Sequence, residues 1–391
     1  MRVLVTGGAG FIGRSLVPIL LERGHEVAVV DSLSPAIHGS DPQLPDSVTL
    51  DSHFVVGDIR DESLWHRLPA AGPDVVVHLA AETGVGQSMH EIERYVDVNL
   101  RGTAVMLEGI RDRWGGVSRL VLASSRAVYG EGSYECDLCG LVTPSQRTDT
   151  QLRDGRWEPT CPSCSGSIVS VPTGEAAGLS PTSVYAMTKA GQEELCRVVG
   201  PTLGAVSAIL RYSNVYGEGQ PLTNPYTGVL GAFALQLMRG EAPRVYEDGG
   251  ESRDFVHVSD VARATALAAE NPRALLLNVG SGARSTLIDI ATQLALAFPK
   301  VDDPIQVTGQ YRLGDIRHFV SDVARLADSL GFQPAVDLQE GLGRFASWVA
   351  AEARIPVEDV ARRAEGELVT RGLLGTRDRD LAAGIDPDLR K

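Results

Sequence analysis

The fold is decided by the stretch Val3-Leu4-Val5-Thr6-Gly7-Gly8-Ala9-Gly10-Phe11-Ile12-Gly13. It predicts a strand, a glycine-rich turn and the start of a helix over residues 11–23. Gly7 allows the tight turn, Gly10 lets a pyrophosphate approach the backbone, and Gly13 lets the helix pack closely on the strand. The start of the helix offers free N–H groups and a favourable dipole to an anion. Together these features predict a dinucleotide-binding site.

Carboxylates end the next two predicted strands. Asp31 follows a strand over residues 26–30, where a carboxylate accepts hydrogen bonds from an adenosine ribose and repels a 2′-phosphate. The preferred cofactor is therefore NAD rather than NADP. Asp58 follows a strand over residues 53–56 and is a candidate contact for the adenine amino group.

Strands and helices alternate through most of the chain. Further strands are expected over residues 75–79, 120–124 and 205–211, and helices over 91–111 and 183–199. Apolar, β-branched strands that alternate with helices predict a parallel sheet covered on both faces. The fold class is therefore α/β, a Rossmann-type doubly wound sheet with a smaller C-terminal substrate lobe and an inserted loop resembling a zinc ribbon.

The composition suggests four units. We expect a cofactor-binding domain of residues 1–130 and 175–213, and an insert over 131–174. Residues 214–350 form a substrate lobe with some return to the sheet, loop-rich over 214–254, and 351–391 form a charged extension with a peripheral helix and a frayed end.

Charge and hydropathy narrow the function classes. The chain has 391 residues, with 36 Lys and Arg against 50 Asp and Glu, and a net charge of −14. Such a surface repels phosphate backbones, so we expect no nucleic-acid partner. No apolar run is long enough to span a bilayer, and the N-terminus leaves no room for a signal peptide, so a cytoplasmic protein without membrane contact is expected.

Four of the five cysteines form two Cys-x-x-Cys pairs within the insert. Cys136 and Cys139 are separated from Cys161 and Cys164 by 21 residues. This spacing predicts a four-thiolate zinc site, which is structural because protein ligands fill all four positions. A redox dithiol pair and plain free thiols are the alternatives. Cys196 stands alone and is expected to be a buried helix residue.

A tyrosine and a lysine four residues apart provide candidate chemistry. Tyr185 and Lys189 share one face of the helix expected over residues 183–199. The positive charge of Lys189 is expected to lower the pKa of Tyr185, so that the phenol can take a proton from a substrate hydroxyl. Ser124 and Ser125 end the strand expected at residues 120–124.

With these motifs in place, the chain resembles the extended short-chain dehydrogenase/reductase family, in particular its NAD-dependent nucleotide-sugar epimerases and dehydratases. The resemblance covers about residues 1–130 and 175–345, and its motifs lie at residues 7–13, 78–81, 99, 125–130, 185–189, 211–217 and 253–258. It implies three catalytic residues: Ser125, which would hydrogen-bond the reacting oxygen, Tyr185, and Lys189, which would also hold the nicotinamide ribose.

The resemblance further implies two sets of contacts. Cofactor contacts are expected from Gly7, Gly10, Phe11, Ile12, Gly13, Asp31, Asp58, Ile59, Leu79, Ala80, Ala81, Asn99, Ser124, Tyr185, Lys189 and Tyr212. Substrate contacts are expected from Thr83, Ser125, Arg126, Asn214, Arg253 and Arg312. Asn214 and the two last-named arginines would hold the diphosphate, since guanidinium groups match phosphate oxygens. Two alternatives stay open: a structural role for Asn99, and a surface ion pair for Arg253.

The expected type of reaction depends on a position where this sequence differs from the family members that eliminate water. Members that eliminate water carry Thr-Asp-Glu or Thr-Ser-Glu where this chain has Ser125-Arg126-Ala127. Without that acid/base pair, the resemblance implies a 4-epimerase, which oxidises C4 and returns hydride to the other face. A UDP-hexose or UDP-uronate 4-epimerase, a 4,6-dehydratase and a non-enzymatic NAD-binding protein are the alternatives.

Two narrower features concern the substrate. The cysteine insert and the sequence Asn224-Pro225-Tyr226-Thr227-Gly228-Val229 are similar to those of the dTDP-L-rhamnose 4-epimerase subgroup. They favour a dTDP-6-deoxy-L-hexose such as dTDP-L-rhamnose. The family resemblance also implies a homodimer through the helices over residues 91–111 and 183–199.

Overall fold

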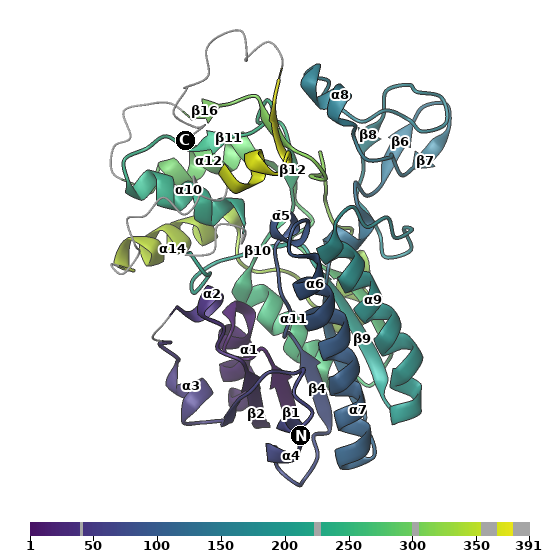
Figure 1. The fold of residues 1–391 in the computed structure, drawn as a ribbon, viewed down its shortest axis with the longest axis vertical. Coiled ribbons are helices and arrows are strands. Elements are labelled where there is room, and N and C mark those ends of the chain that lie inside the picture. The colour runs from purple at the N-terminus through teal and green to yellow at the C-terminus, as the bar shows by residue number, and fades with distance from the viewer. Residues whose placement is uncertain (40–41, 223–227, 299–304, 353–365, 378–391) are drawn as a thin grey trace.

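The computed structural model describes residues 1–39, 42–222, 228–298, 305–352 and 366–377. Seven parallel strands form its central sheet, in the order β3-β2-β1-β4-β5-β9-β14 (Figure 1). They are β1 (Arg2–Thr6), β2 (Glu26–Asp31), β3 (His53–Val56), β4 (Val75–His78), β5 (Arg119–Ser125), β9 (Val206–Tyr212) and β14 (Leu275–Val279). The strand order reverses between β1 and β4, where a crevice opens at the carboxyl ends of a doubly wound sheet. The predicted α/β, Rossmann-type architecture is confirmed.

Helices cover both faces of this sheet. Helices α1 (Phe11–Glu22) and α11 (Val258–Glu270) pack on the face that carries Val3 and Val5. Leu4 points to the other face and joins the core formed with α4 (Leu64–Arg67) and α7 (Gly102–Trp114). Because strand side chains alternate between faces, burial on both sides requires the nearly continuous apolar strands seen in the sequence.

The remaining elements around the sheet are short, apart from α9. They are α2 (Pro35–His38), α3 (Asp46–Thr49), α5 (Val85–Ser88), α6 (Ile92–Tyr95), the π-helix η1 (Val96–Arg101), the 3-10 helices η2 (Arg126–Tyr129) and η3 (Gly200–Leu203), α9 (Val184–Val199) and α13 (Ala324–Leu330). The helix expected over residues 91–111 is therefore interrupted by a π segment, η1, which contains Asn99. Cys196 is buried on α9, as predicted.

A second core belongs to the smaller lobe. It is built by α10 (Val229–Met238), α12 (Leu287–Ala295) and α14 (Leu338–Ala351). The short strand pairs around it are β10 (Asn214–Tyr216) with β13 (Phe255–His257), β11 (Arg244–Val245) with β16 (Gln306–Val307), and β12 (Ser252–Arg253) with β15 (Ser285–Thr286). The loop-rich prediction for residues 214–254 is wrong at α10. This helix is almost wholly apolar and lies between glycines, so it lacks the polar face that marks a helix in sequence.

The insert folds as a small sheet beside this lobe. Strands β7 (Gly140–Val142), β6 (Tyr134–Cys136) and β8 (Val169–Ser170) are antiparallel, and helix α8 (Asp149–Arg153) lies between β7 and β8 in the chain. Figure 1 shows the insert at upper right and the lobe at upper left, both above the same end of the central sheet.

The C-terminal extension departs from the prediction. After helical residues 366–370, strand β18 (Leu374–Thr376) pairs with β17 (Gln310–Arg312) of the lobe. The expected peripheral helix is present at residues 366–370, but the strand after it was not expected. A single strand gives little sequence signal when its partner lies about 60 residues away. The expected frayed end, at residues 378–391, lies outside the described residues, as do residues 224–227 of the substrate motif. Among the helices described, none has the length and apolar character needed to cross a bilayer.

We predict that Gly13→Ala destabilises the protein by about 1–3 kcal/mol, the usual range for overpacking. A Cβ at Gly13 would lie 2.4 Å from the carbonyl oxygen of Gly8, which cannot move without deforming the turn. Gly343→Ala is the matched control, because it also lies within a helix but its Cβ would enter open space. That control should stabilise the fold by about 0.5–1 kcal/mol. Chemical unfolding of both variants tests the pair, and equal stabilities would contradict the prediction.

Candidate active site

A cavity of about 740 Å³ opens at the carboxyl ends of the central strands. It runs from the glycine turn past the ends of β4 and β5 to the lobe. Most of the site residues expected from the sequence line it: Gly7, Gly10, Phe11, Ile12, Gly13, Asp31, Asp58, Ile59, Leu79, Ala80, Ala81, Thr83, Ser124, Ser125, Arg126, Tyr185, Lys189, Tyr212 and Asn214. Asn99, Arg253 and Arg312 do not.

The glycine turn is packed as tightly as its sequence requires. Gly7 has a φ of 71°, and a Cβ there would lie 2.7 Å from the backbone nitrogen of Ala80. Gly10 caps α1, and no side chain bonds the free N–H groups at this end of the helix. The start of α1 therefore presents uncapped backbone N–H groups to the cavity, which suits the pyrophosphate of a dinucleotide.

Asp31 connects the turn to the next strand. Its carboxylate accepts a hydrogen bond from Ala9 N at 3.1 Å and another from Leu33 N at 2.9 Å, and His38 Nε2 lies 3.4 Å away. The Leu33 and His38 nitrogens both lie at Oδ1, whereas Oδ2 accepts only from Ala9 N among the contacts described and keeps a lone pair for a ribose hydroxyl. Asp58 also lines the cavity, but its carboxylate is paired with Arg60 at 2.5 Å, and this pairing holds the pKa of Asp58 below its usual value.

The structure brings the three expected catalytic residues together. Ser125 ends β5, and its hydroxyl accepts a hydrogen bond from Ala127 N at 3.2 Å. Tyr185 lies in the first turn of α9 and Lys189 one turn later. Lys189 is buried, and its Nζ donates to the backbone carbonyl of Ala123 at 2.9 Å.

The electrostatics of this group differ from the sequence-based prediction. Burial raises the pKa of Tyr185, while a hydrogen bond with Ser125 and the charge of Arg126 act to lower it. Burial also lowers the pKa of Lys189 to about 8. The prediction that Lys189 depresses the pKa of Tyr185 is therefore wrong for the protein alone, because burial outweighs the charges and the nearby cation that lowers this pKa is Arg126.

A buried ion pair lies next to the expected catalytic residues and contacts Ser124. Glu193 accepts two hydrogen bonds from Arg211, at 2.9 and 2.6 Å, and one from the hydroxyl of Ser124 at 2.5 Å. Arg211 also donates to the Tyr129 hydroxyl at 2.8 Å. This network ties β5, β9, η2 and α9 together. Glu193 was not predicted as a site residue, although its position four residues after Lys189, on the same face of α9, could have indicated it.

Two polar groups on the substrate side of the cavity can receive a ligand. The Asn214 side-chain oxygen is buried and has no hydrogen-bond partner among the described residues. Such an atom carries a free-energy cost that a ligand donor would relieve. The Arg126 guanidinium lies 5.6 Å from the centre of the Phe319 ring, and burial lowers its pKa to about 10, so it offers a cation to the same part of the cavity.

The three expected residues outside the cavity lining are engaged elsewhere. Asn99 bonds the backbone of Glu82 and the Thr188 hydroxyl, which favours the structural role left open for it. Arg253 is buried and donates to three backbone carbonyls and to Asp315, so it forms no surface ion pair. Arg312 stacks on Tyr246, 4.9 Å from the ring centre.

Several lining residues were not found from the sequence. Glu82 and Arg94 form an ion pair at 2.8 Å beside Thr83, and Gln220 lines the lobe side of the cavity. Their signal in the sequence is weak, because they lie on loops or short helices whose position depends on the tertiary structure. Ile37 and His38 line the cavity near Asp31 and were missed for the same reason.

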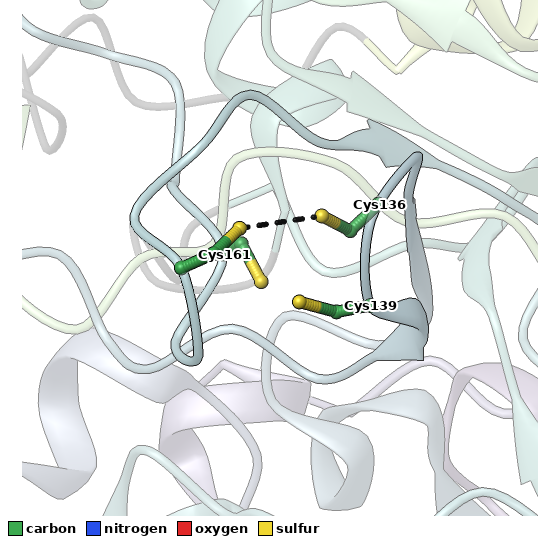
Figure 2. A group of neighbouring side chains, drawn as sticks. Cys136, Cys139 and Cys161 are labelled. Carbon is green, nitrogen blue, oxygen red and sulfur yellow. Dashed lines mark hydrogen bonds between the residues drawn. The ribbon is translucent and has the colours of Figure 1, made fainter.

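The four insert cysteines form a separate cluster. Their sulfur atoms all lie within 4.8 Å of one another, and Cys136 Sγ is 3.6 Å from Cys164 Sγ. Figure 2 shows the labelled Cys136, Cys139 and Cys161 side chains converging from the two knuckles. A tetrahedral zinc ion with bonds of about 2.3 Å places its sulfurs about 3.8 Å apart, so this donor set fits zinc.

Comparison with known proteins identifies the family to which the chain belongs. The sequence profile of the NAD dependent epimerase/dehydratase family matches residues 3–147 and 164–280. The chain is 37% identical to dTDP-L-rhamnose 4-epimerase of Burkholderia thailandensis, over 90% of this chain and 95% of that protein.

Two solved structures have a similar fold. One is UDP-glucose 4-epimerase of Thermotoga maritima with UDP-glucose (TM-score 0.72, 28% identity), which aligns over 90% of this chain and 100% of that one. The other is the Thermus thermophilus UDP-glucose 4-epimerase complex with NAD (TM-score 0.68, 30% identity), with the same coverage. The glycine turn, the Ser-Tyr-Lys group and these matches agree, and the chain belongs to the NAD-dependent epimerase/dehydratase family.

Proposed function

We propose that the protein is an NAD-dependent nucleotide-sugar 4-epimerase acting on a dTDP-6-deoxy-L-hexose such as dTDP-L-rhamnose. The observation that carries the reaction is the meeting of Ser125, Tyr185 and Lys189 in one cavity with the glycine turn. That arrangement joins a cofactor site to a proton-transfer site, as oxidation of a sugar hydroxyl requires.

Each catalytic side chain has a defined task in this proposal. The glycine turn, Asp31 and Lys189 would hold NAD, which would supply a reversible hydride acceptor for C4 of the sugar. Tyr185 takes the C4 hydroxyl proton and later gives it back, and Ser125 holds the reacting oxygen by a hydrogen bond. Lys189, already held by the Ala123 carbonyl, is positioned to bond the nicotinamide ribose and keep Tyr185 in place.

The acidic groups of the cavity argue against elimination of water. Among the described lining residues, the carboxylates are Asp31, Asp58 and Glu82. The first two line the cofactor end, and Glu82 is ion-paired with Arg94. Arg126 and Ala127 occupy the positions where dehydratases carry acids, so no carboxylate beside Ser125 is available to remove a proton next to a 4-keto group.

The choice of dTDP-L-rhamnose rests on the relative from Burkholderia thailandensis and on the cysteine insert. The unpaired Asn214 oxygen and the Arg126 guanidinium are the proposed substrate contacts on the lobe side. Arg253 and Arg312 remain candidates for the diphosphate only if their present contacts exchange for phosphate oxygens. UDP-hexoses and UDP-uronates are the second substrate class, supported by the similarity to UDP-glucose 4-epimerases.

We also propose that the four cysteines hold one structural zinc ion. The knuckles end in residues with positive φ, Gly140 at 72° and Ser165 at 59°, as tight turns around a metal require. Four thiolates leave no open position for water or substrate, so the ion would stabilise the insert rather than take part in the reaction.

The protein is expected to be a homodimer that pairs α6, α7 and α9 with their copies. Apolar side chains are exposed on α6, at Ile92, and on α9, at Met187 and Val198. Light scattering should give about twice the 41.6 kDa chain mass. A concentration-independent monomer mass would contradict the dimer.

The central test follows dTDP-L-rhamnose by proton NMR in D2O without added NAD. We expect a new C4 epimer that carries no solvent deuterium, because hydride moves between the sugar and the bound cofactor. Tyr185→Phe should abolish this change, whereas Tyr311→Phe, which removes a hydroxyl bonded to Asp149 outside the cavity, should retain it.

Each other outcome corrects a different part of the proposal. Deuterium at C3 or C5 would mean enolisation and would overturn the assignment of a simple 4-epimerase. Turnover of UDP-glucose or a UDP-uronate but not of dTDP-L-rhamnose would retain the reaction and replace the substrate.

Arg126 should set the pH at which the enzyme becomes active. The proton acceptor is the ionised phenol of Tyr185, so activity falls as pH drops below the pKa of that group. Removing the Arg126 charge raises this pKa further, and Arg126→Met should move the acidic limb of the kcat profile to higher pH. Arg126→Lys, which keeps the charge, should move it less. Identical profiles for wild type and Arg126→Met would show that this charge does not act on Tyr185.

A further inference from the structure

The insert and the lobe are joined by charged side chains that are almost fully buried. Arg147 of the insert, 1% exposed, contacts both carboxylate oxygens of Glu247 in the lobe at 2.8 Å. Arg317 of the lobe, 4% exposed, donates to the same carboxylate at 2.9 Å. Glu247 therefore lies between two guanidinium groups, one from each unit.

Further contacts cross the same boundary. Glu158 of the insert accepts a hydrogen bond from Arg317 Nε at 2.8 Å and lies 3.1 Å from His318. Glu131, the first insert residue, accepts a hydrogen bond from the backbone nitrogen of Arg317 at 2.8 Å. We call Glu131, Arg147, Glu158, Glu247 and Arg317 the insert–lobe network.

Apolar packing accompanies these ion pairs. Leu152 and Trp157 of the insert form a buried cluster with Tyr311 of the lobe. Removing one partner of a buried ion pair leaves an uncompensated charge, which is strongly destabilising, so the network permits one arrangement of the two units.

This network reaches the substrate side of the cavity. Arg147 also donates to the backbone carbonyl of Asp315 at 3.1 Å, and the Asp315 carboxylate accepts a hydrogen bond from Arg253 at 3.2 Å. The charges of Asp315 and Glu131 act on Arg126, which lines the cavity. Residues of the insert thus set the position of segment 315–317 and the charge environment of Arg126.

The insert itself has little apolar core to hold its shape. Its exposed side chains include the large apolar residues Leu138, Leu141 and Val169, and two of its buried residues are Cys136 and Cys161. A fold this small depends on a cross-link, which the four-cysteine cluster can provide through a metal.

We propose that the four-cysteine insert is a positioning element for the nucleotide-sugar site and acts through the insert–lobe network. Arg147 is its central positioning residue. The proposal rests on the proposed function for the identity of the ligand, but not for the coupling between insert and lobe. Loss of the metal or of the Arg147 charge would release segment 315–317 and weaken nucleotide-sugar binding, while the cofactor end of the cavity, built on the central sheet, would be unaffected.

The test compares the wild type, metal-stripped wild type, Arg147→Met, Arg147→Lys and the control Arg156→Met. Arg156 is also an insert arginine, but its side chain is 65% exposed and its ion pair, with Asp154 at 3.0 Å, lies within the insert. Metal content is measured first. Hydrogen–deuterium exchange is then followed in residues 244–253 and 310–318, with residues 2–31 as the internal reference, and calorimetry gives Kd values for dTDP, UDP and NAD.

We expect faster exchange in residues 244–253 and 310–318 for Arg147→Met and for the metal-stripped protein. The nucleoside diphosphate that wild type binds should bind these forms about tenfold more weakly, a usual size for coupling between sites, with NAD affinity retained. KM for the nucleotide sugar should rise more than kcat falls. Arg147→Lys should recover part of the loss, and Arg156→Met should match the wild type.

Two results would overturn the proposal. One is unchanged exchange and affinity in folded Arg147→Met, and the other is an equal loss of NAD and nucleoside diphosphate affinity, which would indicate general destabilisation. If wild type binds neither dTDP nor UDP, the proposed function fails, while the exchange data still decide whether insert and lobe are coupled. A wild type free of zinc rejects the metal, and Arg147→Met then decides the role of the network alone.

Discussion

The close approach of the first turn to its neighbours is the constraint on which the rest of the site depends. Gly13 lies against Gly8, and Gly7 against Ala80, at distances that no Cβ could occupy. This packing sets the start of α1 beside the ends of β1 and β4, where the sheet order reverses. Because all seven strands are parallel, their carboxyl ends lie at the same edge of the sheet. Of the proposed catalytic residues, Ser125 ends one of these strands, and Tyr185 and Lys189 lie on α9.

The proposed catalytic residues are held by buried charge rather than by apolar packing alone. The Glu193–Arg211 pair, with Ser124 and Tyr129, joins the four elements β5, β9, η2 and α9, and removal of either charged partner would leave an unpaired ion in the core. The site can therefore keep its geometry even where a cavity-lining polar atom lacks a hydrogen-bond partner. Asn214 illustrates this, since its side-chain oxygen lines the cavity without a hydrogen-bond partner among the described residues.

Much of this arrangement could be predicted from the sequence, because it depends on local patterns. Strand β3 is found over the expected residues, and α1 and α9 differ from expectation by one residue at an end. The site residues at strand ends, such as Asp31 and Ser125, follow from the same pattern, because a strand end in a parallel sheet has a known position.

What could not be predicted depends on contacts between distant segments. Helix α10 has no polar face to mark it, and β18 exists because β17 offers it an edge. The pKa of Tyr185 depends on burial, which spacing does not reveal. Arg253 was expected at the diphosphate, but its guanidinium is surrounded by carbonyls of residues 316 and 317, more than 60 positions along the chain.

The two ends of the insert meet where it leaves the central fold. Ser133 N donates to the Thr173 hydroxyl at 2.9 Å, and Val171 N donates to the carbonyl of Ser133 at 3.0 Å. The chain thus departs and returns through almost the same point, so the order of strands in the sheet would be identical with or without the intervening segment. A module with such a narrow neck leaves the connections of the central sheet unchanged, because the two chain ends already lie together and closing the gap between them costs little chain entropy.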